Sequence, residues 1–289
     1  MTIRRLLLFL LLLALAGAAL LGWSYWSAIA NPIVRQTSVT AENWPPGEPP
    51  MRVLLISDIH VAGPDMPPAR LERIVAQMNA LWPDAVLIAG DLVSDKRAAT
   101  RRYPLLEAVA PLSRLRSRFG SFAVLGNHDH WRDEAEAKAA LRAARVTVLD
   151  NEAAMIGPLL VGGLDDAFTG QDDLPQVLRQ MTMRPGVRLL LSHSPDPFPR
   201  VPPWVRLMLG GHTHCGQMRL PWVGALTTMS TYGERYACGR VDEDGKVLVV
   251  GAGLGTSVLP LRLLTPPDMW LVTIGPSAAA PQASSSMSQ

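Results

Sequence analysis

The chain has 289 residues, a formal net charge of +2 and 18% charged residues, and its length suffices for one large domain or two small ones. This near-neutral balance, with no stripe of Lys and Arg, gives no indication of a nucleic-acid partner. Only Cys215 and Cys238 are cysteines, which excludes a disulfide-rich scaffold but leaves open whether the two are bonded in an oxidising compartment.

The N-terminal segment is strongly apolar. Residues 6–30 contain no charged side chain, and about 20 helical residues rising ~1.5 Å each cross the hydrocarbon core of a bilayer. Trp23 and Trp26 follow at the level where interfacial aromatic residues gather. We therefore expect residues 1–30 to form an uncleaved signal anchor that spans the cell (inner) membrane. The alternative is a cleaved signal peptide ending near Ala30, although its apolar region would be unusually long.

The charges around this segment predict its orientation. Arg4 and Arg5 precede it, and only Arg35 follows soon after. The positive-inside rule therefore places the N-terminus in the cytoplasm and the rest of the chain on the extracytoplasmic side. The margin is a single charge, which leaves the cytoplasmic-face orientation as the alternative.

Composition divides the rest of the chain into three parts. Residues 31–50 are rich in proline, and we expect an extended linker there. Residues 51–274 form one continuous globular region without internal repeats. Residues 275–289 have the small, polar composition of a disordered tail.

The globular region alternates apolar runs with helical patterns. Five runs are short and apolar without alternation, which indicates strands buried on both faces: 51–57, 84–90, 121–126, 188–193 and 206–211. Helical patterns occupy 69–82, 104–118 and 134–144. This order predicts an α/β fold in which helices cover the sheets. Two later runs, 246–253 and 269–274, lack intervening helices and predict added antiparallel strands.

Polar side chains stand at the carboxyl end of each of the five runs. They are Asp58 and His60, then Asp91, then Asn127, then His193, and finally His212 and His214. A single such residue could simply cap a helix or make a turn. In open α/β sheets, however, ligands bind at the carboxyl edge of the strands. Five placements of this kind predict a functional site at that edge.

The chemistry of these seven residues indicates metal ions. They offer four imidazoles, two carboxylates and one amide oxygen, whereas one divalent ion takes about four to six ligands. The set therefore predicts two divalent ions that share a bridging ligand, and Asp91, alone on its run, is the natural bridge. Mixed nitrogen and oxygen ligands suit Mn, Fe or Zn, and the sequence does not choose among them.

The blocks DIH, GDLV, GNHD, SH and GHTH, in this order, resemble those of the calcineurin-like metallophosphoesterases over residues 51–274. The resemblance implies a four-layer αββα sandwich, in which helices flank two mixed sheets. It implies one ion held by Asp58, His60 and His214, and a second held by Asn127, His193 and His212, with Asp91 bridging. It further implies that His128 is a catalytic residue outside the ligand set, oriented by Asp129. The apolar N-terminus points to a membrane-associated branch of the family.

The expected reaction is phosphoester hydrolysis by a metal-bridging hydroxide. His128 would stabilise the transition-state charge or protonate the leaving oxygen. His130 either lines the site or lies on the surface at the entry to a helix. Arg262 either contacts a phosphoryl substituent or is an ordinary surface arginine.

Three functions fit the sequence. The first is a membrane-anchored phosphodiesterase or pyrophosphate hydrolase, for which a lipid-linked phosphodiester is a candidate substrate. The membrane-associated branch of the resembled family cleaves UDP-2,3-diacylglucosamine, which is made on the cytoplasmic side and so conflicts with the orientation predicted above. The second is a metal-dependent hydrolase of another ester or amide. The third is a non-catalytic, membrane-tethered binding module, which the complete ligand set argues against.

Overall fold

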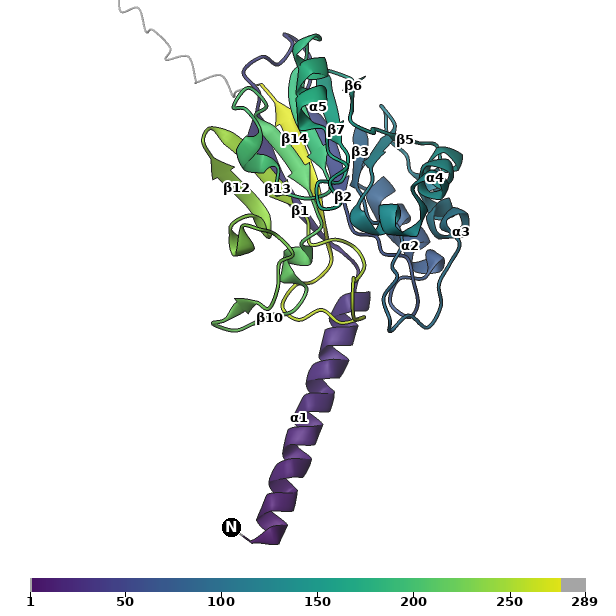
Figure 1. Ribbon diagram of the computed structural model, residues 1–289, viewed down its shortest axis with the longest axis vertical. Helices are drawn as coiled ribbons and strands as arrows, with labels where there is room; N and C mark the ends of the chain where they lie inside the picture. The colour runs from purple at the N-terminus through teal and green to yellow at the C-terminus, as the bar shows by residue number, and fades with distance from the viewer. Residues whose placement is uncertain (1, 277–289) are drawn as a thin grey trace, which may run out of the picture.

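The computed structural model describes residues 2–276. The helix α1 (Ile3–Ile29) projects from one end of a globular body (Figure 1). Within the described range it is the one helix long and apolar enough to cross a membrane. Apart from its first two residues, the tail predicted at 275–289 lies outside the described residues.

Two six-stranded sheets form the centre of the globular body. The first contains, in spatial order, β1 (Ile33–Thr40), β14 (Asp268–Gly275), β2 (Met51–Ile56), β3 (Ala85–Ala89), β4 (Ser121–Val124) and β5 (Val146–Val148). The second contains β12 (Gly239–Glu243), β13 (Lys246–Val250), β9 (Leu207–Gly210), β8 (Val187–Ser192), β7 (Leu159–Leu164) and β6 (Glu152–Ile156). Apolar side chains of the two facing surfaces, such as Leu55 and Leu189, pack into one core between the sheets.

Helices cover the outer face of each sheet. Over the first sheet lie α2 (Pro68–Asn79), α3 (Leu105–Val109), the 3₁₀ helix η1 (Ala110–Arg114) and α4 (Asn127–Ala143). Over the second lie α5 (Leu174–Thr182) and the 3₁₀ helix η2 (Phe198–Arg200). The remaining elements belong to loops: η3 (His214–Gly216), β10 (Arg219–Leu220), β11 (Gly224–Ala225) and η4 (Gly233–Tyr236). The predicted four-layer αββα sandwich is confirmed.

Some local predictions differ from the structure. Much of the segment 31–50, expected to be a linker, is the strand β1, which pairs in parallel with β14. Its Ile, Val and Thr residues favour a strand, and β14 offers a free edge for it. The predicted helix 104–118 is shorter, because Pro111 supplies no N–H donor and the chain tightens there into η1. The late strands are mixed rather than antiparallel: β13 is parallel to β9, and β14 is parallel to β1.

Strand direction decides which end of the body carries the loops after the strands. β1 begins at Ile33, close behind α1, and Ile33 pairs with Asp268 at the start of β14. β14 is antiparallel to β2, whereas β3, β4 and β5 run parallel to β2. The carboxyl ends of β2 to β5 therefore lie where α1 joins the body. We call the edge with Ile33, Ile56 and Asp268 the anchor end, and the opposite edge, with Thr40 and Met51, the distal end.

The second sheet has the same polarity. β7, β8, β9 and β13 are mutually parallel. Directly after β13, the Ala252 N–H donates to Asp268 at the anchor end (2.8 Å). The carboxyl ends of these strands therefore face the anchor end as well.

Candidate metal centre

The structure brings all seven predicted ligands together at the anchor end. Each follows the carboxyl end of a strand, and each is at most 5% exposed: Asp58, His60, Asp91, Asn127, His193, His212 and His214. They are contributed by β2, β3 and β4 of the first sheet and by β8 and β9 of the second. The site therefore lies at the junction of the two sheets.

The ligand atoms fall into two sets that share Asp91. In the first set, the Nε2 atoms of His60 and His214 lie 3.0 Å apart, and Asp58 Oδ1 lies 3.5 Å from His214 Nε2. Asp91 Oδ2 lies 3.4 Å from His60 Nε2, and also 3.4 Å from Nε2 of His193, which belongs to the second set.

In the second set, His193 Nε2 lies 3.1 Å from the side-chain oxygen of Asn127 and 3.1 Å from His212 Nδ1. One carboxylate oxygen of Asp91 thus stands between both sets.

The tautomers show that this donor set fits a metal. Three imidazoles donate their outer N–H to a backbone carbonyl: His60 Nδ1 to Val93 (3.3 Å), His193 Nδ1 to Ala89 (2.7 Å) and His212 Nε2 to Met229 (3.2 Å). Because a carbonyl only accepts, the inner nitrogen of each of these rings carries a lone pair when the ring is neutral. The inner nitrogens of His193 and His212 face each other across 3.1 Å, so a cation, either a proton on His193 or a metal ion, has to lie between them. Metal-binding histidines are oriented in this way.

Burial and the close contact of the charged groups shift the pKa values of the cluster in different directions. Burial raises the pKa of Asp58 to about 6, and Asp91 adds to this rise although His193 opposes it. Burial would raise the pKa of Asp91 too, but His193 and His60 outweigh it and hold that pKa well below its usual value. Burial lowers the pKa of His60 and His214 well below the usual value. For His193, the carboxylates Asp91 and Asp58 outweigh burial and raise its pKa well above the usual value.

Backbone strain is concentrated in the same residues. Five of the seven have a left-handed backbone: Asp58 (φ 48°), His60 (49°), Asp91 (57°), His212 (70°) and His214 (51°). This conformation is costly for residues with a side chain and clusters at functional sites. Two glycines permit the close packing, because a Cβ on Gly126 would collide with Asp91, and one on Gly211 would collide with Asp58.

His128 and Asp129 do not interact as expected. The Asp129 carboxylate accepts hydrogen bonds from the backbone N–H groups of Gly126, Asp91 and Leu92, each at 2.9 Å. It thus ties the loop after β3 to the start of α4 and does not orient the His128 ring. Among the described residues, His128 Nδ1 is one of three buried side-chain polar atoms without a hydrogen-bond partner. The His128 ring packs edge-on against His60, with centroids 4.8 Å apart.

Aromatic side chains border the centre. The His128 ring lies 5.0 Å from Trp131, Trp131 lies 6.2 Å from Phe168, and Phe168 lies 4.6 Å from His212, measured between centroids. Trp131 and Phe168 are both exposed. We call these two residues the aromatic rim. Phe168 could not be predicted from the sequence, because it lies outside the motif blocks and contacts His212 only through the fold.

Two further predictions are settled by the structure. His130 is not a surface residue at the helix entry, since its Nε2 lies 2.8 Å from Asp165 Oδ1 and its side chain is only 8% exposed. Arg262 is neither on the surface nor placed as a substrate contact, because it is fully buried. Its guanidinium donates to carbonyl oxygens of the loop after β13, among them Ala252 (2.7 Å) and Gly253 (3.1 Å).

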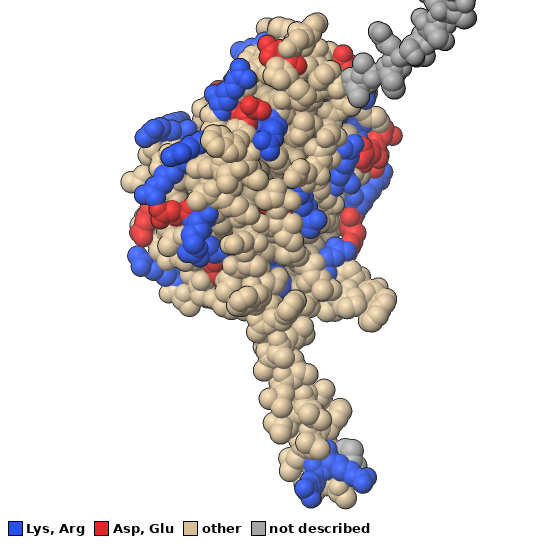
Figure 2. Space-filling view, turned by 180° about the vertical axis from the view of Figure 1, so that it is seen from behind, with Lys and Arg blue, Asp and Glu red and all other residues tan. Residues whose placement is uncertain are grey.

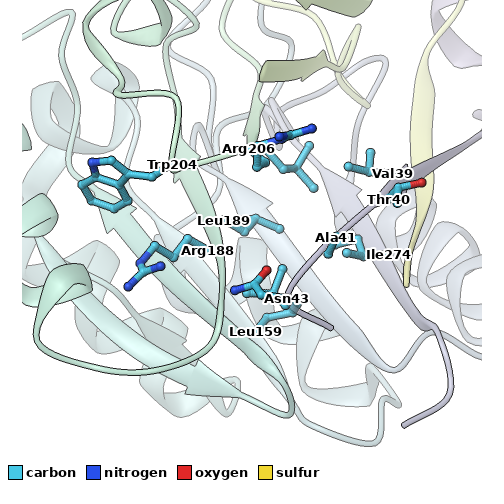
Figure 3. A pocket seen from close by; sticks show the side chains of 12 residues that line it. Val39, Thr40, Ala41, Asn43, Leu159, Arg188, Leu189, Trp204, Arg206 and Ile274 are labelled. Carbon is cyan, nitrogen blue, oxygen red and sulfur yellow. The ribbon is translucent and has the colours of Figure 1, made fainter. Parts of the chain in front are cut away.

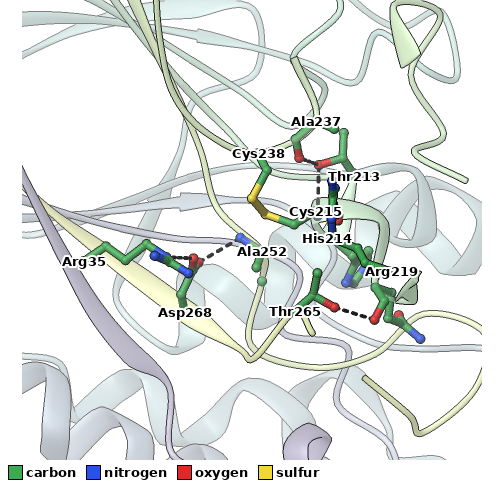
Figure 4. The surroundings of a disulfide bond; sticks show 12 residues. Arg35, Thr213, His214, Cys215, Arg219, Ala237, Cys238, Ala252, Thr265 and Asp268 are labelled. Atoms are coloured by element: carbon green, nitrogen blue, oxygen red, sulfur yellow. Dashed lines mark hydrogen bonds and ion pairs between the residues drawn. A yellow bond between two sulfur atoms is a disulfide. The ribbon is translucent and has the colours of Figure 1, made fainter. Parts of the chain in front are cut away.

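A disulfide fastens the turn that carries two of the histidines. Cys215 and Cys238, whose pairing the sequence left open, are bonded to each other (Figure 4). Next to the bond, Thr213 Oγ1 donates to the carbonyl of Ala237 (2.6 Å). The GHTHC turn is thereby linked to the chain before β12.

A separate small crevice lies at the distal end and has no part in this centre. Its lining includes Val39 of the first sheet and Ala41 just after it, Leu189 and Leu207 of the second sheet, and Trp204 (Figure 3). Its volume is about 30 Å³, room for roughly two water molecules. A phosphoester substrate does not fit there.

Known proteins share this organisation. Residues 51–216 match the family model of the calcineurin-like phosphoesterases. An uncharacterized metallophosphoesterase of Aquifex aeolicus is 33% identical over 251 residues, covering 83% of this chain and 91% of that protein. The uncharacterized metallophosphoesterase YkuE of Bacillus subtilis is 29% identical over 274 residues, covering 90% of this chain and 93% of YkuE.

A third relative contains a membrane segment by name. A transmembrane protein with metallophosphoesterase domain of Danio rerio is 30% identical over 257 residues, covering 82% of this chain and 56% of that protein. Together with α1, this relative indicates a membrane anchor. The chain belongs to the calcineurin-like phosphoesterase family and is a metal-dependent phosphoester hydrolase.

Proposed function

We propose that this enzyme is a membrane-anchored phosphodiesterase or pyrophosphate hydrolase with a two-ion centre, and that its substrate is a lipid-linked phosphodiester. The observation that carries the proposal is the position of Asp91, whose Oδ2 lies 3.4 Å from a histidine nitrogen of each set. A carboxylate in this position can serve two ions at once.

The seven ligand residues divide into two groups that share Asp91. Asp58, His60 and His214 would hold one ion, Asn127, His193 and His212 the other, and Asp91 both. Two bound ions supply Lewis-acid polarisation of the phosphoryl group and activation of a water. The Asp129 carboxylate keeps the loops of Asp91 and Asn127 together through its three backbone hydrogen bonds.

His128 is proposed as the catalytic residue outside the ligand set. Its Nδ1 has no partner among the described residues, and its backbone N–H donates to Asp91 Oδ1 (2.9 Å). This bond holds the ring next to the proposed bridging carboxylate while its nitrogens stay available. The ring can then donate a proton or a hydrogen bond to the oxygen that leaves phosphorus.

The aromatic rim and the anchor support a diester with a bulky substituent. Trp131 and Phe168 present exposed ring surface beside the centre, which can contact a group attached to the phosphate. The anchor α1 keeps the enzyme at a membrane, where an amphiphilic substrate is enriched and a diffusible one is not.

Elemental analysis and substrate screening test the proposal. Purified, active, unchelated protein should contain about two divalent ions per chain, and a single ion would exclude the two-ion centre. Aryl phosphodiesters should be hydrolysed faster than the matching monoesters, and the reverse order would refute the diester assignment.

The lipid assignment has its own test. Deleting residues 1–21 removes most of α1 but keeps Ser24 and Ala28, which are buried against the body. Turnover of a phosphodiester lipid in vesicles should fall several-fold, while hydrolysis of a soluble aryl phosphodiester stays unchanged. Equal loss in both assays, or in neither, would contradict a membrane substrate.

A further inference from the structure

Large apolar side chains are exposed at the anchor end, on two loops. The first loop is the β10–β11 hairpin, where Trp222 is fully exposed and Val223 is 69% exposed. The second is the loop 257–264, where Val258 is 68% exposed. We call the set the anchor-end surface: Leu220, Trp222, Val223, Val258, Leu259 and Leu264. Exposed apolar groups gathered in this way mark an interaction site.

Charge is nearly absent from both loops, and the exception is Arg219 at the base of the hairpin, which pairs with Glu234 (2.7 Å). Residues 220–233 contain no Asp, Glu, Lys or Arg, and Arg262, the one charged residue within 251–267, is fully buried. In Figure 2 the hairpin is the tan projection at the edge of the body where α1 joins it, whereas the blue and red side chains lie over the rest of the body and at the free end of α1. An exposed apolar surface next to an apolar helix is suited to contact with the same lipid bilayer as the helix.

Hydrogen bonds join both loops to α1. The Arg262 N–H donates to the Ser24 carbonyl of α1 (2.9 Å). The Gln217 side chain, just before the hairpin, donates to the carbonyls of Leu259 and Leu261, each at 3.0 Å. The Arg219 N–H donates to the Leu263 carbonyl (3.0 Å). Helix, loop and hairpin therefore form one connected unit.

The helix is also held at its end. Arg70 Nη2 donates to the carbonyl of Ala30 (2.7 Å), and Gln77 Nε2 donates to that of Pro32 (2.9 Å). β1 then begins at Ile33, so no free linker separates the helix from the sheet. The position of the body relative to α1 is therefore determined by direct contacts.

Helix length sets the depth of this unit. Residues 6–25, the first twenty after Arg4 and Arg5, all lie in α1 and span ~30 Å, about the thickness of the hydrocarbon core. Trp23 and Trp26, both exposed, then lie at the bilayer interface. Ser24, between them, is the residue bonded to the loop 257–264. That loop and the attached hairpin accordingly lie at the level of the lipid headgroups.

We propose that the anchor-end surface is a membrane-binding surface, seated in the headgroup layer of the bilayer that α1 crosses. The partner is the lipid surface itself. The carboxyl ends of the strands, which carry the seven residues of the metal centre, face this same end. The centre therefore opens beside the bilayer, where it meets amphiphilic phosphoesters whose phosphate lies at headgroup depth. This last consequence rests on the proposed function, whereas the seating of the surface does not.

Fluorescence quenching by lipids tests the proposal on the full-length chain. Trp222→Cys is labelled with an environment-sensitive maleimide dye and reconstituted in nanodiscs with one chain each. Some lipids carry a nitroxide just below the glycerol backbone. The unsubstituted chain should take no label, because its two cysteines are bonded to each other. Val258→Cys provides a second position in case the first variant does not fold.

Trp82→Cys is the matched control. Trp82 is likewise an exposed tryptophan (81%) with a left-handed backbone (φ 50° against 62° for Trp222), but it precedes β3 at the distal end. Each labelled variant should hydrolyse a soluble phosphoester at the wild-type rate, which shows that its fold is intact. The same assay tests the proposed function independently of the quenching measurement.

The nitroxide lipid should quench the labels at positions 222 and 258 several-fold more strongly than the label at position 82. Equal quenching at both ends would overturn the proposal. Blue-shifted emission at position 222 without quenching by the lipid would also overturn it and assign the surface to a protein contact instead.

Discussion

The anchor end and the distal end of the double sheet are built from the same strands but differ in almost every local property. The anchor end carries seven buried polar ligand-type residues, five of them with a left-handed backbone, together with the disulfide. The distal end carries a crevice of about 30 Å³ lined largely by apolar residues, and a more open, polar hollow of about 380 Å³ lined by residues such as Arg206 and Arg240. The apolar core between the sheets supplies stability, and the seven buried ligand-type residues follow the carboxyl ends of the strands. Buried ligand-type residues with a left-handed backbone are thus concentrated at the anchor end, although single distal residues such as Trp82 also have a left-handed backbone.

The largest difference is expected between two Asp→Asn substitutions, one at each end of β3. Asp91 follows β3 and stands between the two ligand sets, whereas Asp84 precedes β3 and accepts the Arg52 N–H (2.8 Å). Asp91→Asn should lower metal occupancy and hydrolysis together, by at least on the order of a hundredfold. Asp84→Asn should leave both unchanged. Elemental analysis and steady-state kinetics measure this, and similar losses at both positions would break the contrast.

His128→Ala tests whether this residue acts outside the ligand set. Removing a general acid should lower kcat by about 10²–10⁴-fold, while metal content stays at the wild-type level. Because His128 lies within reach of His60 and Asp91, loss of metal together with activity would instead make it a ligand.

Replacing both cysteines by serine should loosen the anchor end. Cys215 and Cys238 are 23 positions apart, and a bond that closes such a loop stabilises a fold by about 2–4 kcal/mol. Denaturant unfolding of the double variant should show a loss of this size, and reduced wild-type protein should behave in the same way. An unchanged free energy of unfolding would mean that the bond does not hold the GHTHC turn.

Tryptophan truncation compares the aromatic surfaces of the two ends. Trp131→Ala removes half of the aromatic rim, and contacts of this kind contribute about 0.5–1.5 kcal/mol. KM for a bulky aryl phosphodiester should rise roughly two- to twelvefold, with kcat little changed. Trp204→Ala, at the crevice of the distal end, should leave KM unaltered. A kcat effect without a KM effect at Trp131 would contradict a substrate-contact role.

The smallest effect concerns the pair His130 and Asp165. The hydrogen bond that the His130 ring donates to the Asp165 carboxylate raises the pKa of His130 above its usual value of 6.5, although burial opposes this. The stabilisation is therefore fully present below about pH 6.5 and is lost as the pH rises through the higher folded-state pKa. Asp165→Asn should lower the free energy of unfolding most at mildly acidic pH and least in alkaline buffer. A deficit that does not change with pH would exclude this ion pair.

The sequence by itself determined the layered fold and the composition of the ligand set. Strands buried on both faces have to be continuous apolar runs, so their order along the chain predicts an α/β sandwich. The residues that end those runs must emerge at one edge when the strands are parallel. Asp58, Asp91 and Asn127 could therefore be placed together without coordinates.

Tertiary structure alone decided the features that depend on partners far along the chain. Residues 31–50 resemble a linker in sequence. Ile33–Thr40 nevertheless forms a strand, because it pairs with β14, more than two hundred residues later in the chain. Arg262 resembles a surface residue in sequence, but it is buried because carbonyl groups of the loop after β13 accept its hydrogen bonds. The Cys215–Cys238 bond and the place of Phe168 in the aromatic rim are of the same kind. Local sequence encodes backbone propensity and polarity, whereas such contacts arise only when distant segments pack against each other, and no local pattern records that packing.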